Sequence, residues 1–140
     1  MNLELLRPTY TSGKEVILME NPVQAGFPSP AEDFKADKIS LDIALVKNRE
    51  TTFYARVKGD SMIEADMEEG DILVIDKSLE PTDGKIAVCM VDGDFTVKQI
   101  RTDRDCVWLL PYNKKYKPIR ITEENDFMVW GIVTYIIKPV

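Results

Sequence analysis

The chain has 140 residues, with 18 basic and 24 acidic side chains, and it contains no histidine. This length is about one domain and suffices to bury a core without disulfides or a structural metal. The formal charge of −6 makes the chain a poor candidate for gripping nucleic-acid phosphates, which requires clustered Lys and Arg. The lack of histidine excludes Ser-His-Asp triads, Cys-His dyads and histidine-ligated metal sites, and we expect no metal or other cofactor.

Cellular location is predicted from the cysteines and the apolar runs. Cys89 and Cys106 lie in apolar stretches without C-x-x-C spacing, which indicates buried, inert thiols in a reducing compartment. The first residues lack the pattern of a signal peptide, and no apolar run approaches the roughly 20 residues that span a bilayer. We therefore expect a soluble, cytoplasmic protein with no membrane contact.

Residues 1–28 contain Pro8, Pro22 and Pro28 among polar side chains, with a single short apolar run at 16–19. Scattered turn-formers of this kind predict a flexible N-terminal arm, followed by one folded domain over residues 29–140. At the start of that domain, Ser29 and Pro30 are typical of a helix N-terminus. A second short helix is predicted over residues 40–47, where apolar side chains share one face.

From residue 52 onward the pattern changes to short apolar runs separated by turn signals. Asp92-Gly93 is a two-residue loop of the type that favours a tight hairpin. The predicted strands cover about 52–58, 71–76, 85–91, 94–101, 106–110, 118–122 and 127–137. Seven short strands predict a mainly β fold, a compact antiparallel β-sandwich or partly open barrel, with one or two short N-terminal helices.

Without histidine, a serine can still be activated by a lysine that is neutral at the working pH. Burial lowers a lysine pKa because desolvation penalises the charged form. Gly59-Asp60-Ser61-Met62 directly follows the strand at 52–58, and Gly59 permits a sharp exit that leaves the Ser61 hydroxyl at the mouth of the sheet. A helical turn over 62–67 would make the backbone N–H groups of Ser61 and Met62 converge as oxyanion donors.

The candidate lysine is Lys98, in the strand at 94–101, where alternation places Thr96, Lys98 and Ile100 on one face. Taken alone, each residue has an ordinary interpretation. Ser61 fits a common strand-to-turn connection, and most strand lysines face solvent. The pattern of the residues leaves both interpretations open.

Three ordered motifs give the chain a resemblance to a known family. Gly59-Asp60-Ser61-Met62, Glu69-Gly70-Asp71-Ile72-Leu73 and Asp92-Gly93-Asp94-Phe95-Thr96-Val97-Lys98 are similar to segments of the self-cleaving LexA/UmuD peptidases, and the likeness runs from about residue 23 to the C-terminus. Gln24-Ala25-Gly26-Phe27-Pro28-Ser29-Pro30-Ala31 resembles the cleavage segment of the UmuD branch. About 25 residues precede this segment, fewer than the winged-helix DNA-binding domain of LexA-type repressors needs.

The resemblance implies a serine endopeptidase with a Ser-Lys dyad, in which Ser61 is the nucleophile and Lys98 the general base. The implied cleavage site is the bond between Ala25 and Gly26. A small residue and a glycine suit a bond that is drawn into a narrow cleft.

The family's biology implies the partners. Self-cleavage in the DNA-damage (SOS) response is stimulated by the RecA–single-stranded-DNA filament, and the shortened homodimer partners a UmuC-type translesion DNA polymerase in mutagenesis. The acidic charge fits this assignment, since the partners would contact the DNA. Two alternatives are a non-catalytic β-rich module for dimerisation and polymerase binding, and the regulatory domain of a LexA-type repressor.

Overall fold

The computed structural model describes residues 2–7, 16–19, 36–58, 67–111 and 117–140. These residues form ten strands and one helix: β1 Asn2–Leu6, β2 Val16–Met19, β3 Ala36–Ile39, α1 Leu41–Leu45, β4 Thr52–Lys58, β5 Ile72–Asp76, β6 Ile86–Val91, β7 Asp94–Thr102, β8 Val107–Leu110, β9 Ile119–Ile121 and β10 Phe127–Ile137. The prediction of a mainly β fold is confirmed. Among the described residues no helix has the length and apolar character needed to cross a bilayer.

The chain divides into two compact units. The smaller unit, Thr9–Lys47, contains the antiparallel pair of β2 and β3, in which Val16 lies opposite Ile39, and the five-residue helix α1. The larger unit combines Met1–Pro8 with Asn48–Val140 and contains the other eight strands. The predicted motifs after residue 52 all belong to this larger unit.

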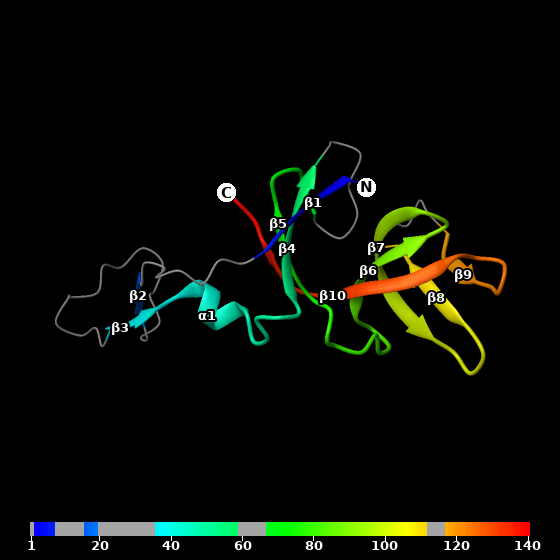
Figure 1. Ribbon diagram of the computed structural model, residues 1–140, viewed down its shortest axis with the longest axis horizontal. Coiled ribbons are helices and arrows are strands. Elements are labelled where there is room, and N and C mark those ends of the chain that lie inside the picture. The colour runs from blue at the N-terminus through cyan, green and yellow to red at the C-terminus, as the bar shows by residue number, and fades with distance from the viewer. Residues whose placement is uncertain (1, 8–15, 20–35, 59–66, 112–116) are drawn as a thin grey trace, which may run out of the picture. The chain divides into compact units, whose positions relative to one another are not determined.

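The eight strands of the larger unit form one antiparallel sheet in the order β1-β4-β5-β10-β6-β7-β8-β9, which is not closed into a barrel. Strand β10 connects its two parts, because residues 132–137 of β10 pair with β5 and residues 127–132 pair with β6. Figure 1 shows β10 running from the group of β1, β4 and β5 to the group of β6 to β9. The candidate serine follows a strand of the first group, and the candidate lysine belongs to the second.

Strand β10 changes direction through two irregularities, between Val129 and Gly131 and between Val133 and Tyr135. Gly131 lies where β10 and β5 are close together, since a Cβ atom there would meet Cγ2 of Ile75 at 2.5 Å. Ile75 is fully buried. Glycine at this bulge therefore lets β10 approach β5 closely.

The sheet buries apolar side chains on both faces. One core cluster consists of Ala55, Val57, Met67, Leu73, Ile75, Val88 and Val97. A second consists of Ala87, Cys89, Ile100, Leu109 and Ile132. Neighbouring residues of β6 and β7 divide between the two clusters, as strand alternation requires. Side chains near the middle of β7 are consequently buried whichever face they occupy.

The tight hairpin predicted at Asp92-Gly93 is present between β6 and β7. Both residues have positive φ, 50° for Asp92 and 88° for Gly93, as a two-residue turn of the primed type demands. The Asp92 carboxylate accepts hydrogen bonds from the Asn125 side chain and the Asp126 backbone N–H. These bonds tie the hairpin to the turn that precedes β10.

The seven strands predicted after residue 52 are confirmed within a residue or so of their expected ends, and the short helix at 40–47 is present as α1. Three strands were not predicted. Residues 2–6 and 16–19, expected to lie in a loosely packed arm, form β1 and β2, and residues 36–39 form β3. The helix start at Ser29-Pro30 lies outside the described residues. The division into an arm of residues 1–28 and a domain of residues 29–140 stays a prediction.

Candidate active site

Lys98 lies near the middle of β7 and is buried, with 7% of its surface exposed. It is opposite Ala87 of β6, and alternation places it on the face that carries Ile100 and the second core cluster. Both neighbours, Val97 and Gln99, are at least partly buried. The interpretation of Lys98 as a solvent-facing strand lysine is therefore wrong, and the expected apolar setting is present.

Strand β4 ends at Lys58, immediately before the segment 59–66 that contains Ser61. After that segment, Gly70 and Asp71 form hydrogen bonds with the end of the same strand, and residues 68–71 are called the return here. The Gly70 N–H donates to the Val57 carbonyl, and the Val57 N–H donates to the Asp71 carbonyl, each at 2.9 Å. Gly70 has a φ of +92°, which favours glycine at this turn. Both ends of the segment that contains Ser61 are thus fixed at the end of β4.

A buried carboxylate stabilises this return. Asp71 is 1% exposed and accepts hydrogen bonds from the Glu68 N–H, at 2.9 Å, and from the Lys138 side chain. Burial opposes ionisation of Asp71, but the Lys138 hydrogen bond, the Glu68 N–H and the Lys138 charge outweigh it and keep the pKa below its ordinary value. Asp71 thereby ties residues 68–71 to the residues that follow β10.

The core brings the two candidate strands together. Val57, near the end of β4, and Val97, next to Lys98, belong to the same cluster, although β5, β10 and β6 separate their strands in the sheet. The first residue after the Ser61 segment, Met67, is fully buried in that cluster too. Lys98 itself lies on the opposite face of β7, so this cluster joins both flanks of the Ser61 segment to the strand that carries Lys98.

Four of the predicted site residues, namely Ser61, Met62, Ala25 and Gly26, lie outside the described residues. Of the predicted dyad the structure therefore places Lys98. Sequence reasoning missed Asp71 and Lys138 as parts of this region. The motif Glu69-Gly70-Asp71 was a signal for Asp71, whereas Lys138 is 67 positions away from Asp71 and carries no local signal.

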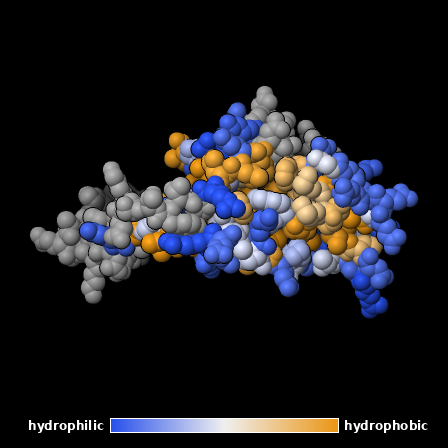
Figure 2. All heavy atoms as spheres, viewed as in Figure 1, coloured by the Kyte–Doolittle hydropathy of each residue, from blue (hydrophilic) through white to orange (hydrophobic). Residues whose placement is uncertain are grey.

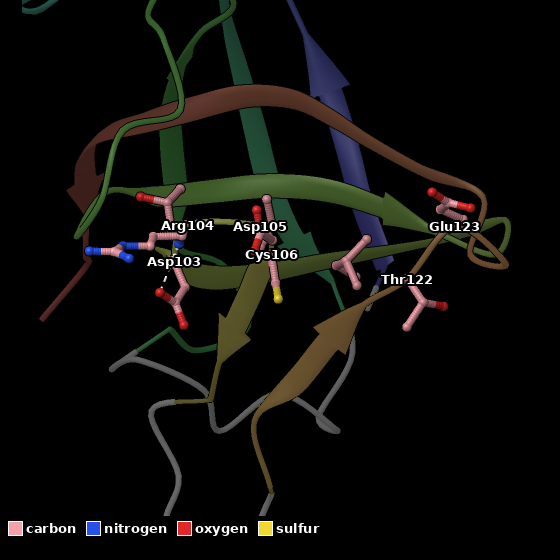
Figure 3. Close-up of a pocket in the computed structure, with 9 residues that line it drawn as sticks. Asp103, Arg104, Asp105, Cys106, Thr122 and Glu123 are labelled. Atoms are coloured by element: carbon pink, nitrogen blue, oxygen red, sulfur yellow. Dashed lines mark hydrogen bonds between the residues drawn. The ribbon is translucent and has the colours of Figure 1, made fainter.

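An open cavity of about 470 Å³ lies elsewhere on the larger unit and is lined by residues 102–107 and 121–123. Figure 3 shows that its labelled residues come from the β7–β8 turn and from the chain after β9. Asp103, Asp105 and Glu123 give it an acidic lining, but no group of metal-binding side chains is found in the part of the chain that the structure describes. Lys98 does not line it.

The two thiols differ from each other. Cys89 is buried as predicted, and burial raises its pKa to about 11, which makes it inert at neutral pH. Cys106 was predicted to be buried too, but it is partly exposed and lines the cavity, because it lies just before β8, the strand next to the edge of the sheet. Neither thiol forms a disulfide.

Comparison with known proteins matches residues 17–134 to the Peptidase S24-like family. The chain therefore belongs to the Peptidase S24-like family. Protein MucA of Salmonella typhimurium is 36% identical over 115 residues, covering 81% of this chain and 77% of MucA. Protein ImpA of the same species is 31% identical over 140 residues, covering 94% of this chain and 91% of ImpA.

A LexA repressor of Desulfatibacillum aliphaticivorans is 35% identical over 138 residues, which cover 97% of this chain and 66% of the repressor. These relatives and the S24-like match confirm the resemblance to LexA/UmuD peptidases. The S24-like match covers β3 to β9 in full and most of β2 and β10. The chain is thus a member of a peptidase family over the region in which Lys98 and the Ser61 segment are found.

Acid pH is expected to destabilise the protein through Asp71 and Asp76. Asp76 is 7% exposed; burial opposes its ionisation, but hydrogen bonds from Ser78 and Thr51 outweigh this and lower its pKa. Because both folded-state pKa values lie below the ordinary 3.8, the unfolded chain binds more protons around that pH. Their contribution to stability is complete above about pH 5 and is lost as the pH falls through the lowered folded-state values.

Urea unfolding between pH 2.5 and 7 measures this dependence. Asp76→Asn should lower stability at pH 7 and flatten the acid limb of the stability curve. The exposed Asp105→Asn is the matched control and should leave the limb as it is. An Asp76→Asn protein with an unchanged acid limb would contradict the assignment.

Proposed function

We propose that the protein is a self-cleaving serine endopeptidase that cuts its own Ala25–Gly26 bond with Ser61 as nucleophile and Lys98 as general base. The observation that carries the proposal is the burial of Lys98 at 7% exposure in a member of the Peptidase S24-like family. Lysine is rarely buried in the interior of a protein, and general-base catalysis is one function that a buried lysine can have. The proposed reaction supplies such a function and requires no histidine, metal or other cofactor.

The chemistry follows the usual course of acyl transfer. Lys98 Nζ accepts the Ser61 hydroxyl proton while Oγ attacks the Ala25 carbonyl carbon. The backbone N–H groups of Ser61 and Met62 stabilise the resulting oxyanion. Collapse breaks the C–N bond, and Lys98 returns its proton to the Gly26 amine. Water, deprotonated by Lys98, then hydrolyses the Ser61 ester and releases residues 1–25 from residues 26–140.

Three features of the described residues support this assignment. Val57, near the end of the strand before the Ser61 segment, is hydrogen-bonded to Gly70 and Asp71, which follow that segment. Val97 and Val57 share one core cluster. Lys98 lies on the face of β7 that carries the second core cluster, with 7% of its surface exposed.

The proposed setting is the SOS response to DNA damage. We propose that the RecA–single-stranded-DNA filament stimulates cleavage by favouring the conformation in which the cleavage segment is docked. The shortened chain then acts as a cytoplasmic homodimer that partners a UmuC-type translesion polymerase. A net charge of −6 fits a protein that reaches DNA through its partners.

The test of this setting is cleavage at neutral pH with and without RecA filament, followed by intact-mass spectrometry. We expect at least a tenfold faster appearance of residues 26–140 with filament than without it. RecA without single-stranded DNA is the control and should leave the rate unchanged. A chain that stays whole with filament would contradict the proposed regulation.

The LexA relative supports a second candidate, the regulatory domain of a LexA-type repressor. The two candidates share the cleavage reaction and differ in the partner. Co-purification of the shortened chain with a UmuC-type polymerase supports the first candidate. Failure of that binding, with cleavage intact, would favour the second.

A further inference from the structure

Strand β1 covers an edge that would otherwise be open. It pairs antiparallel with β4, from Asn2 opposite Lys58 to Leu6 opposite Tyr54, and it is the outermost strand of the sheet at this end. Figure 1 shows β1 beside β4. The outer backbone N–H and C=O groups of β4 are therefore bonded to residues 2–6. Such groups, once uncovered, are a template for another strand.

Side chains of β1 form ion pairs with β4 on one face and apolar contacts on the other. On one face, Glu4 accepts from Arg56 at 3.1 Å and lies 3.2 Å from the Lys58 ammonium. The hydrogen bond and charge of Lys58, with help from Arg56, hold the pKa of Glu4 below its usual value. On the other face, Leu3 packs against the first core cluster, opposite Val57.

The ends of β1 add further contacts. Directly after β1, the Arg7 guanidinium lies over the Phe53 ring of β4, 5.1 Å from the ring centroid. Leu5 leaves 43% of its surface exposed, and Figure 2 shows apolar residues gathered at the surface where β1 lies. The segment that β4 binds therefore has one acidic residue, Glu4, between two leucines, and a cation follows it.

Residues 2–6 precede the Ala25–Gly26 bond. Because β4 follows that bond, cleavage there would leave β1 and β4 on separate chains. The pairing of β1 with β4 would then be a bimolecular complex that dilution weakens. Arg56 and Lys58 have half-exposed side chains even with Glu4 in place, and they would remain on the uncovered strand as two unmatched cations.

We propose that the outer edge of β4 is a strand-binding site, which residues 2–6 occupy in the whole chain and which cleavage opens to an extended segment of a partner protein. The partner segment has the chemistry of β1: a carboxylate opposite Arg56 and within reach of Lys58, with an aliphatic residue on either side. Backbone pairing supplies affinity, and the two cations supply selectivity for acidic strands. The inference rests on the proposed function, since it takes self-cleavage as the event that opens the edge.

The experiment tests strand binding at the β4 edge without relying on self-cleavage. A Ser61→Ala chain, with a recognition sequence for an added protease placed within residues 20–28, is cut by that protease and passed over a gel-filtration column. The probe is a fluorescent synthetic peptide of residues 2–7, followed by anisotropy. We expect the cut chain to bind the peptide at least tenfold more tightly than the uncut chain. The Glu4→Lys peptide should bind about fivefold more weakly than the natural one.

A charge swap sharpens the test. In the Arg56→Glu, Lys58→Glu chain, the order of the two peptides should reverse, so that the Glu4→Lys peptide binds better. The exposed Lys85→Glu is the matched control and should preserve the natural order. Co-elution of the released fragment with the cut chain would mean that residues 2–6 still cover β4 after the cut, and it would contradict the proposal that cleavage opens this edge.

The proposal is overturned if the fragment elutes separately, circular dichroism shows an intact sheet, and the cut chain still fails to bind the peptide at millimolar concentration. Equal binding to cut and uncut chains would overturn it as well. Because the added protease makes the cut, a failure of self-cleavage leaves these outcomes unchanged. The experiment can therefore show that β4 does not bind a strand whether or not the protein cleaves itself.

Discussion

Lys98→Ala is expected to slow self-cleavage at Ala25–Gly26 by about 1000-fold, and Ser61→Ala to abolish it. Without Lys98 no side chain of the proposed dyad accepts the serine proton, and without Ser61 there is no nucleophile. The double variant should be no slower than Ser61→Ala alone, because the two residues act as a unit. Quantitative gels of the whole and shortened chains over several hours measure these rates.

The Lys98→Arg variant tests whether Lys98 acts as a general base or only as a buried positive charge that stabilises the fold. A guanidinium stays protonated in proteins, so this variant keeps the charge and loses the base. We expect it to be as inactive as Lys98→Ala, while Lys85→Ala, at an exposed lysine, cleaves at the natural rate. Thermal unfolding of each variant confirms that it is folded under the assay conditions. Cleavage by folded Lys98→Arg at the natural rate would contradict the assigned role.

Asp71→Ala is expected to lower the free energy of unfolding by about 2–3 kcal/mol. The change removes a buried carboxylate that accepts from the Glu68 N–H and the Lys138 ammonium. The Glu68 N–H loses its partner, and residues 68–71 are no longer tied to the residues after β10. Urea unfolding at pH 7 measures the loss.

The same change should slow cleavage by about tenfold at a temperature where the variant is folded, because the return after the Ser61 segment is held less firmly. Glu69→Ala is the matched control, since Glu69 is an exposed acidic residue in the same turn. It should change the free energy of unfolding by less than about 0.5 kcal/mol. If the two variants were equally stable, Asp71 would not have the role assigned to it.

The strands after residue 52 could be predicted because each is a short apolar run bounded by turn residues. The Asp92-Gly93 hairpin is the clearest case, since positive φ at both positions is a local requirement. Strand β1 shows the limit of this reasoning. Leu3 and Leu5 alternate with polar residues, but the partner that makes them a strand is β4, about fifty positions away. Strand β3, with the sequence Ala-Asp-Lys-Ile, has no apolar alternation and depends on its pairing with β2.

Some features of the candidate site could likewise be predicted from local sequence, and others depend on contacts between distant residues. Alternation placed Lys98 on the face of Ile100, and that placement agrees with the core clusters. Its burial was not a local property, because it results from a sheet that packs on both faces. The ion pair of Asp71 with Lys138 joins residues 67 positions apart, so no spacing within either segment could indicate it. Long-range contacts of this kind decide which polar residues of a β-rich protein are buried.

The central claim is that Ser61 and Lys98 cut the Ala25–Gly26 bond of their own chain. Intact-mass spectrometry of the purified protein after incubation at about pH 10 tests it most directly, because alkaline pH favours neutral lysine. The account predicts two products, residues 1–25 and residues 26–140, from the natural chain and none from Ser61→Ala or Lys98→Ala. An uncut natural chain at this pH, or the same two products from either variant, would contradict it.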